Sequence, residues 1–209
     1  FDYYESSGFF PEYNNIDKIL AYGILGGVPR YLEAFDSSKT IEQNIATRII
    51  QNGSYLYEEP MNLLKAEVRE TNIYNSILSA IASGKNKMID IANFIHEDRT
   101  KVAKYLNTLQ ILRLIEKRVP CGESETSKKS IYVIKDNFFK FWFRYEFTNN
   151  VYYSILGSSE ASKEIMKDIS NFMWDIFEDI CTEYLIRLAR LRKLPFIPYH
   201  IGKWWGNNP

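Results

Sequence analysis

The sequence predicts a mainly α-helical protein that contains a winged helix-turn-helix. Apolar residues recur at helical spacing through most of the chain. Only two stretches of the middle region, 114–119 and 131–134, show the alternation of strands that pair with each other. Around them the order is helix, short strand, helix, turn, helix, strand, loop, strand, which is the order of a winged helix. A small helical unit precedes it, and a helical segment after 136 leads into what we expect to be a truncated α/β domain.

Composition restricts the class of protein. The 209 residues carry 26 basic and 26 acidic side chains and are 45% hydrophobic, which is too apolar for a disordered chain. No stretch approaches the roughly 18 apolar residues of a membrane span, so no membrane partner is expected. Two cysteines, Cys121 and Cys181, and two histidines, His96 and His200, predict a reduced, cytoplasmic protein without a zinc site. Because the chain begins with Phe1 rather than Met, we expect an internal piece of a longer protein.

The first 70 residues predict a small helical unit with an acidic surface. Helical spacing covers 14–25, and a second short helix covers 29–35. A third helix begins after Thr40, whose distance from Gln43 is that of a capping box. Pro60 is expected to begin a fourth helix.

The middle region predicts the winged helix element by element. The expected elements are a helix over 71–84, a short strand over 86–88, helices over 89–95 and 99–110, and strands over 114–119 and 131–134. Asp98 is a suitable N-cap for the helix that follows it. The polar loop 121–130 then forms the wing between the last two strands.

The helix over 99–110 is the main functional candidate. Its apolar residues Val102, Leu106 and Leu109 share one face. The residues that project from the other face are Arg99, Thr100, Lys101, Lys104 and Asn107. In the major groove such a helix reads guanine with Arg or Lys and adenine with Asn. Lys128 and Lys129 of the wing suit phosphate contacts. These seven residues are the predicted DNA-binding residues.

The charge distribution supports an anionic partner for this region. Residues 85–135 carry 11 basic and six acidic side chains, although the whole chain is neutral. Two other interpretations remain open, because a basic face is often merely solvated and winged helices also serve as protein-interaction modules. The expected partner is therefore duplex DNA or another protein.

The last third combines a buried aromatic helix with an unfinished domain. The stretch 137–147 is so rich in aromatic side chains that we expect it to be buried on several sides. Residues 161–192 predict one or two helices, and 196–205 resembles a strand separated from its sheet. Trp204 and Trp205 are interpreted as core of the truncated domain rather than as a binding surface.

Catalytic motifs give little evidence of enzyme chemistry in this chain. The sequence contains no G-x-x-x-x-G-K-[ST], H-E-x-x-H or G-x-S-x-G pattern. Glu178 and Asp179 are adjacent acidic residues on a helix and are expected to be solvated. The two glycines before Pro29 would let a ligand approach the backbone. A helix C-cap followed by an N1 proline is the interpretation that elementary physics favours for this segment.

Six segments in order resemble a known family. They are 26–32 (GGVPRYL), 56–60 (LYEEP), 77–84 (ILSAIASG), 141–145 (FWFRY), 177–181 (FEDIC) and 201–205 (IGKWW). Together they resemble the C-terminal two-thirds of the archaeal-type P-loop ATPases, a prokaryotic branch of the signal-transduction ATPases related to AAA+ proteins. The resemblance extends over nearly the whole chain.

This resemblance implies a domain order and a cofactor. Residues 1–70 would be the end of the ATPase core and its helical lid, 71–136 the winged helix, and 137–209 the start of a restriction-endonuclease-like domain of unknown function. Gly27 and Pro29 would lie near the nucleotide base. ATP and Mg²⁺ would bind only to the full-length protein, because the Walker motifs would precede this chain.

Three hypotheses about function follow from the sequence. The first is a nucleotide-responsive regulatory region whose winged helix binds DNA or a partner. The second is a nucleotide-independent winged-helix regulator of transcription. The third is a nucleic-acid-processing enzyme whose active site is completed by residues farther along the protein. This chain would contribute Glu178 to that site.

Overall fold

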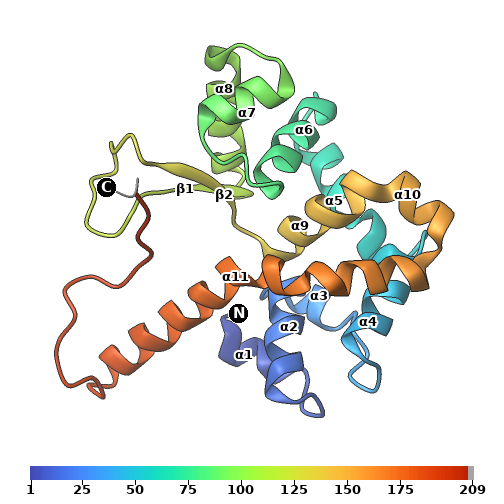
Figure 1. Ribbon diagram of the computed structural model, residues 1–209, viewed down its shortest axis with the longest axis horizontal. Helices are drawn as coiled ribbons and strands as arrows, with labels where there is room; N and C mark the ends of the chain where they lie inside the picture. Colours follow the sequence, from blue (N-terminus) through green and yellow to red (C-terminus); the bar gives the residue numbers. More distant parts are fainter. Residues whose placement is uncertain (207–209) are drawn as a thin grey trace.

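The computed structural model describes residues 1–206 and confirms the predicted fold class (Figure 1). Over these residues the protein is mainly helical with a small two-stranded antiparallel sheet. A continuous apolar core extends from the first helices through the winged helix to the long C-terminal helix. Among the described residues, no helix has both the length and the apolar character that crossing a membrane requires. Residues 207–209, the end of the predicted C-terminal unit, lie outside the described residues.

The N-terminal helices lie close to where the sequence predicts them. They are α1 (Tyr3–Ser7), α2 (Asn15–Leu25), α3 (Pro29–Leu32), α4 (Ile41–Asn44), the π-helical turn η1 (Ile45–Ile50) and α5 (Tyr55–Glu67). The capping box is confirmed, because the Thr40 side chain accepts from the Gln43 backbone N–H and the Gln43 side chain accepts from the Thr40 backbone N–H. The expected start of a helix at Pro60 is wrong. The helix begins five residues earlier, and Pro60 lies inside it and is buried.

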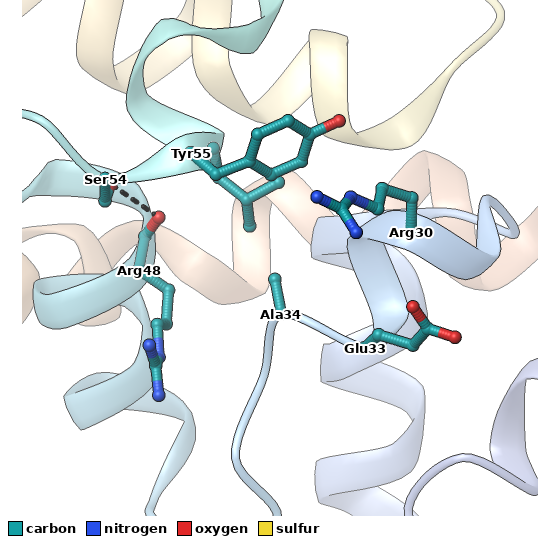
Figure 2. Close-up of a pocket in the computed structure, with 7 residues that line it drawn as sticks. Arg30, Glu33, Ala34, Arg48, Ser54 and Tyr55 are labelled. Carbon is teal, nitrogen blue, oxygen red and sulfur yellow. Dashed lines mark hydrogen bonds between the residues drawn. The ribbon is translucent and has the colours of Figure 1, made fainter.

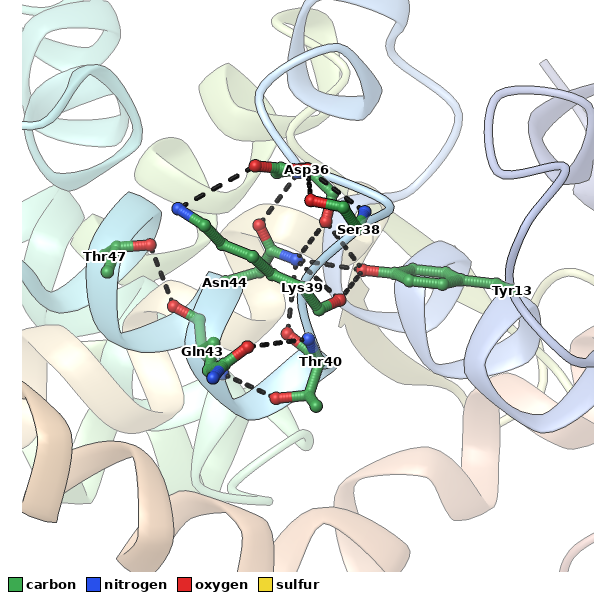
Figure 3. Close-up of polar contacts among 8 residues, drawn as sticks. All are labelled: Tyr13, Asp36, Ser38, Lys39, Thr40, Gln43, Asn44 and Thr47. Carbon is green, nitrogen blue, oxygen red and sulfur yellow. Dashed lines mark hydrogen bonds and ion pairs between the residues drawn. The ribbon is translucent and has the colours of Figure 1, made fainter.

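A buried carboxamide fixes the turn before α4 (Figure 3). Asn44 is fully buried, and its Oδ1 accepts from the backbone N–H of Asp36 at 2.9 Å. Its Nδ2 donates to the Asp36 carbonyl at 2.8 Å and to the hydroxyl oxygen of Tyr13 at 2.9 Å. The Tyr13 hydroxyl in turn donates to the carbonyl of Lys39 at 2.8 Å. This network joins the turn, α4 and the segment before α2.

The winged helix forms as predicted in its helices and in its wing. Its elements are α6 (Thr71–Ala82), α7 (Met88–Ile95), α8 (Arg99–Ile111), β1 (Ile115–Arg118) and β2 (Ile131–Ile134). The two strands are antiparallel, with Ile115 opposite Ile134. The short strand expected at 86–88 does not form. The Tyr132 N–H donates to the Asn86 carbonyl at 2.7 Å, but α7 begins at Met88 and leaves no room for a longer ladder.

The aromatic helix is buried on several sides, as the sequence predicts. It comprises α9 (Asn137–Trp142) and the π-helical turn η2 (Phe143–Phe147), followed by α10 (Thr148–Leu156). Phe138, Phe141 and Phe143 are all completely buried. α2, α6 and β2 pack against this helix, and the Trp142 indole N–H donates to the Tyr57 carbonyl at 3.0 Å. This aromatic helix is therefore part of the central core.

A single long helix, α11 (Ser158–Arg190), follows. It packs against α2, α4 and η1. Its second half also contacts α1, where Glu183 accepts from the Tyr3 N–H at 3.3 Å, and its end projects beyond the other helices (Figure 1). The strand expected over 196–205 is wrong, because this segment has no regular secondary structure. It returns to the wing instead, where the Cys121 N–H donates to the Lys203 carbonyl at 2.7 Å. Trp204 is 68% exposed, so its expected place in a core is also wrong within the described residues.

Candidate functional site

Helix α8 presents the predicted DNA-binding residues to solvent. Val102, Leu106 and Leu109 are at most 1% exposed and fix the helix against the winged-helix core. The residues that the sequence predicts to face outward, Arg99, Thr100, Lys101, Lys104 and Asn107, are all exposed. Because the buried face is rigidly packed, the outward side chains have a defined direction.

The N-terminus of α8 offsets part of its own positive charge. The Asp98 side chain accepts from the Thr100 backbone N–H at 2.7 Å, and this bond holds the pKa of Asp98 below its usual range. Lys101 lies 3.2 Å from Glu97. These two acids counter the unfavourable placement of basic residues at the positive end of the helix dipole. Arg99 and Lys104 form no ion pair with any described residue, so they contribute most of the field of this face.

The wing lysines differ in how firmly they are held. Lys128 is exposed. Lys129 is exposed as well, but its ammonium lies 2.6 Å from Glu123, and its carbonyl accepts from the Trp205 indole N–H at 2.9 Å. A phosphate contact by Lys129 therefore competes with an existing ion pair, whereas one by Lys128 does not.

A polar groove between α8 and the wing contains basic residues that the sequence analysis did not select. The groove has a volume of about 560 Å³, and its lining includes Arg113, Lys117 and Lys135. Arg113 adopts a left-handed conformation, φ 59°, that ends α8 and turns the chain into β1. All three belong to the basic segment 85–135. Only the fold gathers them, because none shares the outward face of α8.

Charged side chains tie the wing to α11 and to the C-terminal segment. The Arg118 guanidinium donates to both carboxylate oxygens of Asp179, at 3.2 and 3.1 Å. Lys203 lies 3.1 Å from Asp179 and 3.5 Å from Glu178. Glu178 is exposed, as expected, whereas Asp179 is half-buried between Arg118 and Lys203. Both acids hold basic residues that approach from other segments.

In the N-terminal helical unit Gly27 is half-buried and Pro29 is exposed. Pro29 is exposed at the first position of α3, which confirms its interpretation as an N1 proline. The Gly27 carbonyl accepts from the Phe1 backbone nitrogen at 2.9 Å. A Cβ on Gly27 would lie 1.9 Å from the Phe1 carbonyl oxygen, so this position requires glycine.

A cavity of about 410 Å³ opens beside this segment, lined in part by Arg30, Arg48 and Tyr55 (Figure 2). The Arg30 guanidinium lies 4.9 Å from the centre of the Tyr55 ring, at cation–π distance. Gly27 and Pro29 do not line the cavity. The two arginines were not among the predicted site residues, although Arg30 directly follows Pro29 in the sequence.

Comparisons with known proteins cover different parts of the chain. Residues 142–209 match DUF234, a family described as archaeal and bacterial proteins of unknown function. An uncharacterized protein of Methanocaldococcus jannaschii is 34% identical over 201 residues, which are 94% of this chain and 44% of that protein. The chain thus spans less than half the length of this relative. No solved structure matches the chain significantly.

Proposed function

We propose that this chain is the C-terminal regulatory region of an ATP-binding P-loop ATPase, and that its winged helix binds duplex DNA. The observation that carries the DNA-binding part is the exposed basic face of α8, held in a fixed direction by three buried residues on its other side. A single helix with this arrangement fits the width of the major groove. The wing adds Lys128 and Lys129 as candidates for phosphate contacts, and the groove beside it is lined by three basic and two acidic residues.

The basic residues have two separable roles under this proposal. Lys101 and Lys104 neutralise phosphates, so their contribution to affinity falls as salt rises. Asn107 lies one turn farther along the same face, and its carboxamide suits the edge of adenine. It contributes sequence preference rather than counterion release.

The ATPase part of the proposal rests on the resemblance and on the length of the relative. Six segments resemble the archaeal-type P-loop ATPases in order. This chain covers 44% of its relative, so the part of the relative that it does not cover is long enough to contain a nucleotide-binding core. ATP and Mg²⁺ would bind to that core, with Gly27 and Pro29 in the lid near the base. A nucleotide that favours one arrangement of core and lid would change the position of the winged helix.

Salt-dependent DNA binding tests the proposal. Fluorescence anisotropy of a labelled duplex is measured over a range of salt for the unmodified chain and for Lys101→Ala/Lys104→Ala. The slope of log affinity against log salt should flatten by up to about two units in the double variant. Asn107→Ala should leave the slope unchanged and alter the preferred sequence.

A matched control uses another pair of exposed lysines. Lys163 and Lys167 lie on α11 and pair with acids close by in sequence, as Lys101 does. Lys163→Ala/Lys167→Ala should leave the salt slope unchanged. If the unmodified chain does not bind duplex at low salt, the winged helix is a protein-interaction module instead. If both double variants flatten the slope equally, α8 has no special role in binding.

A further inference from the structure

A second cavity, of about 360 Å³, opens between α5 and the helical run from α9 to α10. Its lining includes Tyr57, Glu58 and Met61 from α5, and Trp142, Glu146 and Phe147 from the other side. Trp142 and Glu146 are buried, whereas Glu58 is exposed. The cavity therefore combines an aromatic and acidic interior with a polar entrance.

Glu146 has no counter-charge to explain its burial. The residue is 2% exposed, and its Oε2 is closed off from solvent and accepts no hydrogen bond from the described residues. A carboxylate in such surroundings is costly unless a donor or a cation accompanies it. Burial alone raises the pKa of Glu146 to about 7. Its position in the π-helical turn η2 is a second sign of function, because such turns are frequent at functional sites.

The chemistry of the lining selects the class of ligand. The Trp142 indole N–H already donates to the Tyr57 carbonyl, so it is engaged within the protein. The unpaired Oε2 of Glu146 is a hydrogen-bond acceptor, so it requires a ligand that donates a hydrogen bond. Tyr57, Trp142 and Phe147 line the cavity, and aromatic rings favour a positively charged group over a neutral one. No group of three potential metal ligands gathers in residues 1–206, which favours an organic cation over a metal ion.

We propose that this cavity binds an alkyl ammonium or alkyl guanidinium group, with Glu146 as its counter-ion. The apolar stem of such a ligand would pass Met61 and Phe147, while Glu58 and Lys65 at the entrance carry opposite charges. This chemistry has two sources, a small free amine and the side chain of a lysine or arginine on another protein. The site is independent of the DNA-binding face, because none of its lining residues belongs to the winged helix.

Binding of n-butylamine tests the proposal, with n-butanol as the neutral analogue of the same length. The Trp142 indole N–H resonance of the ¹⁵N-labelled chain reports occupancy. We expect n-butylamine, but not n-butanol, to shift this resonance. Binding should strengthen from about pH 6 to about pH 8 as Glu146 ionises. The other titratable groups that face Glu146 are Tyr57 and Glu58 on α5 and Tyr153 on α10, with Lys65 at the entrance.

Two variants separate a specific site from general attraction. Glu146→Gln retains the size of the side chain and should weaken n-butylamine binding at least about tenfold, as loss of a buried charge partner does. Glu58→Gln removes an exposed charge and should weaken binding less than about threefold. Equal binding by Glu146→Gln and the unmodified chain would overturn the proposal. So would the absence of a shift at about 50 mM n-butylamine.

A further arm distinguishes the two sources of the cation. Nα-acetyl-lysine amide carries the same ammonium on a peptide backbone. If it binds at least as well as n-butylamine, the site accepts a protein side chain. If n-butylamine binds and the lysine derivative does not, the cavity serves a small free amine.

Discussion

Replacement of Asn44 by alanine should be among the most destabilising single changes in the N-terminal unit. The Asn44 side chain is completely buried and makes three hydrogen bonds of 2.9 Å or less, two with the backbone of Asp36 and one with Tyr13 (Figure 3). Asn44→Ala deletes all three and leaves the Asp36 N–H without its partner. With a net loss of about 1 kcal/mol for each bond and a further 1–2 for the stranded donor, we expect a loss of roughly 4–5 kcal/mol.

Asn44→Asp tests whether the polarity of this network is as described. The new carboxyl still accepts from the Asp36 N–H, but it faces the Asp36 carbonyl where the amide used to donate. It must be protonated to donate there, so its pKa in the folded state should be raised above the unfolded value. A raised folded pKa means that stability is present at low pH and is lost as pH rises through that value. This variant should therefore be less destabilised near pH 5 than near pH 8.

Urea unfolding followed by circular dichroism measures both effects. Thr47→Ala is a suitable control, because its hydroxyl donates only to the Gln43 carbonyl on the outside of the same helix. The control should lose no more than about 0.5 kcal/mol. If the free energy of unfolding of Asn44→Ala lies within about 1 kcal/mol of that of the unmodified protein, the network does not stabilise the fold in this way. The same conclusion follows if Asn44→Asp has the same stability at both pH values.

Two further changes test the structure elsewhere. Asp136 caps α9 by accepting from the Phe139 N–H at 2.9 Å, yet burial raises its pKa to about 6, so its ionisation opposes folding as pH rises from 4 to 6. Asp136→Asn keeps the cap and should raise the free energy of unfolding by roughly 1–2 kcal/mol at pH 8 and by almost nothing at pH 4. Thermal unfolding at the two pH values measures this difference, and an equal gain in stability at both would refute the explanation. Gly27→Ala should cost about 1–3 kcal/mol, because the new methyl group meets the Phe1 backbone. Amide exchange in α1 should rise with it, and unchanged exchange would contradict the contact.

Local signals were sufficient to predict the winged helix. The start of α8 is specified by the Asp98 cap, and its direction by Val102, Leu106 and Leu109, which lie at helical spacing. These signals lie within one element and need no knowledge of distant contacts. The predicted outward face of α8 is exposed for the same reason.

Features that depend on distant segments were not predictable from the sequence. The pattern over 196–205 resembles a strand, but a strand requires a neighbour, and among the described residues this segment has a backbone partner only at Cys121. Glu146 looks like an ordinary helical residue in sequence. Its burial depends on the segments that pack around η2, among them α6, and no local pattern shows this. Arg113, Lys117 and Lys135 likewise meet only after α8 turns into the wing.

The attachment of the wing has a consequence for how the protein is made. Arg118 is paired with Asp179, which follows it by 61 positions, and the Lys129 carbonyl is bound by Trp205, 76 positions later. At a synthesis rate of roughly 5–20 residues per second, Arg118 exists for about 3–12 s before Asp179 is made. During this interval Arg118 has Glu116 of its own strand as an acidic partner, but not Asp179. The newly made wing therefore carries Arg118 without the second carboxylate that balances its charge in the finished protein.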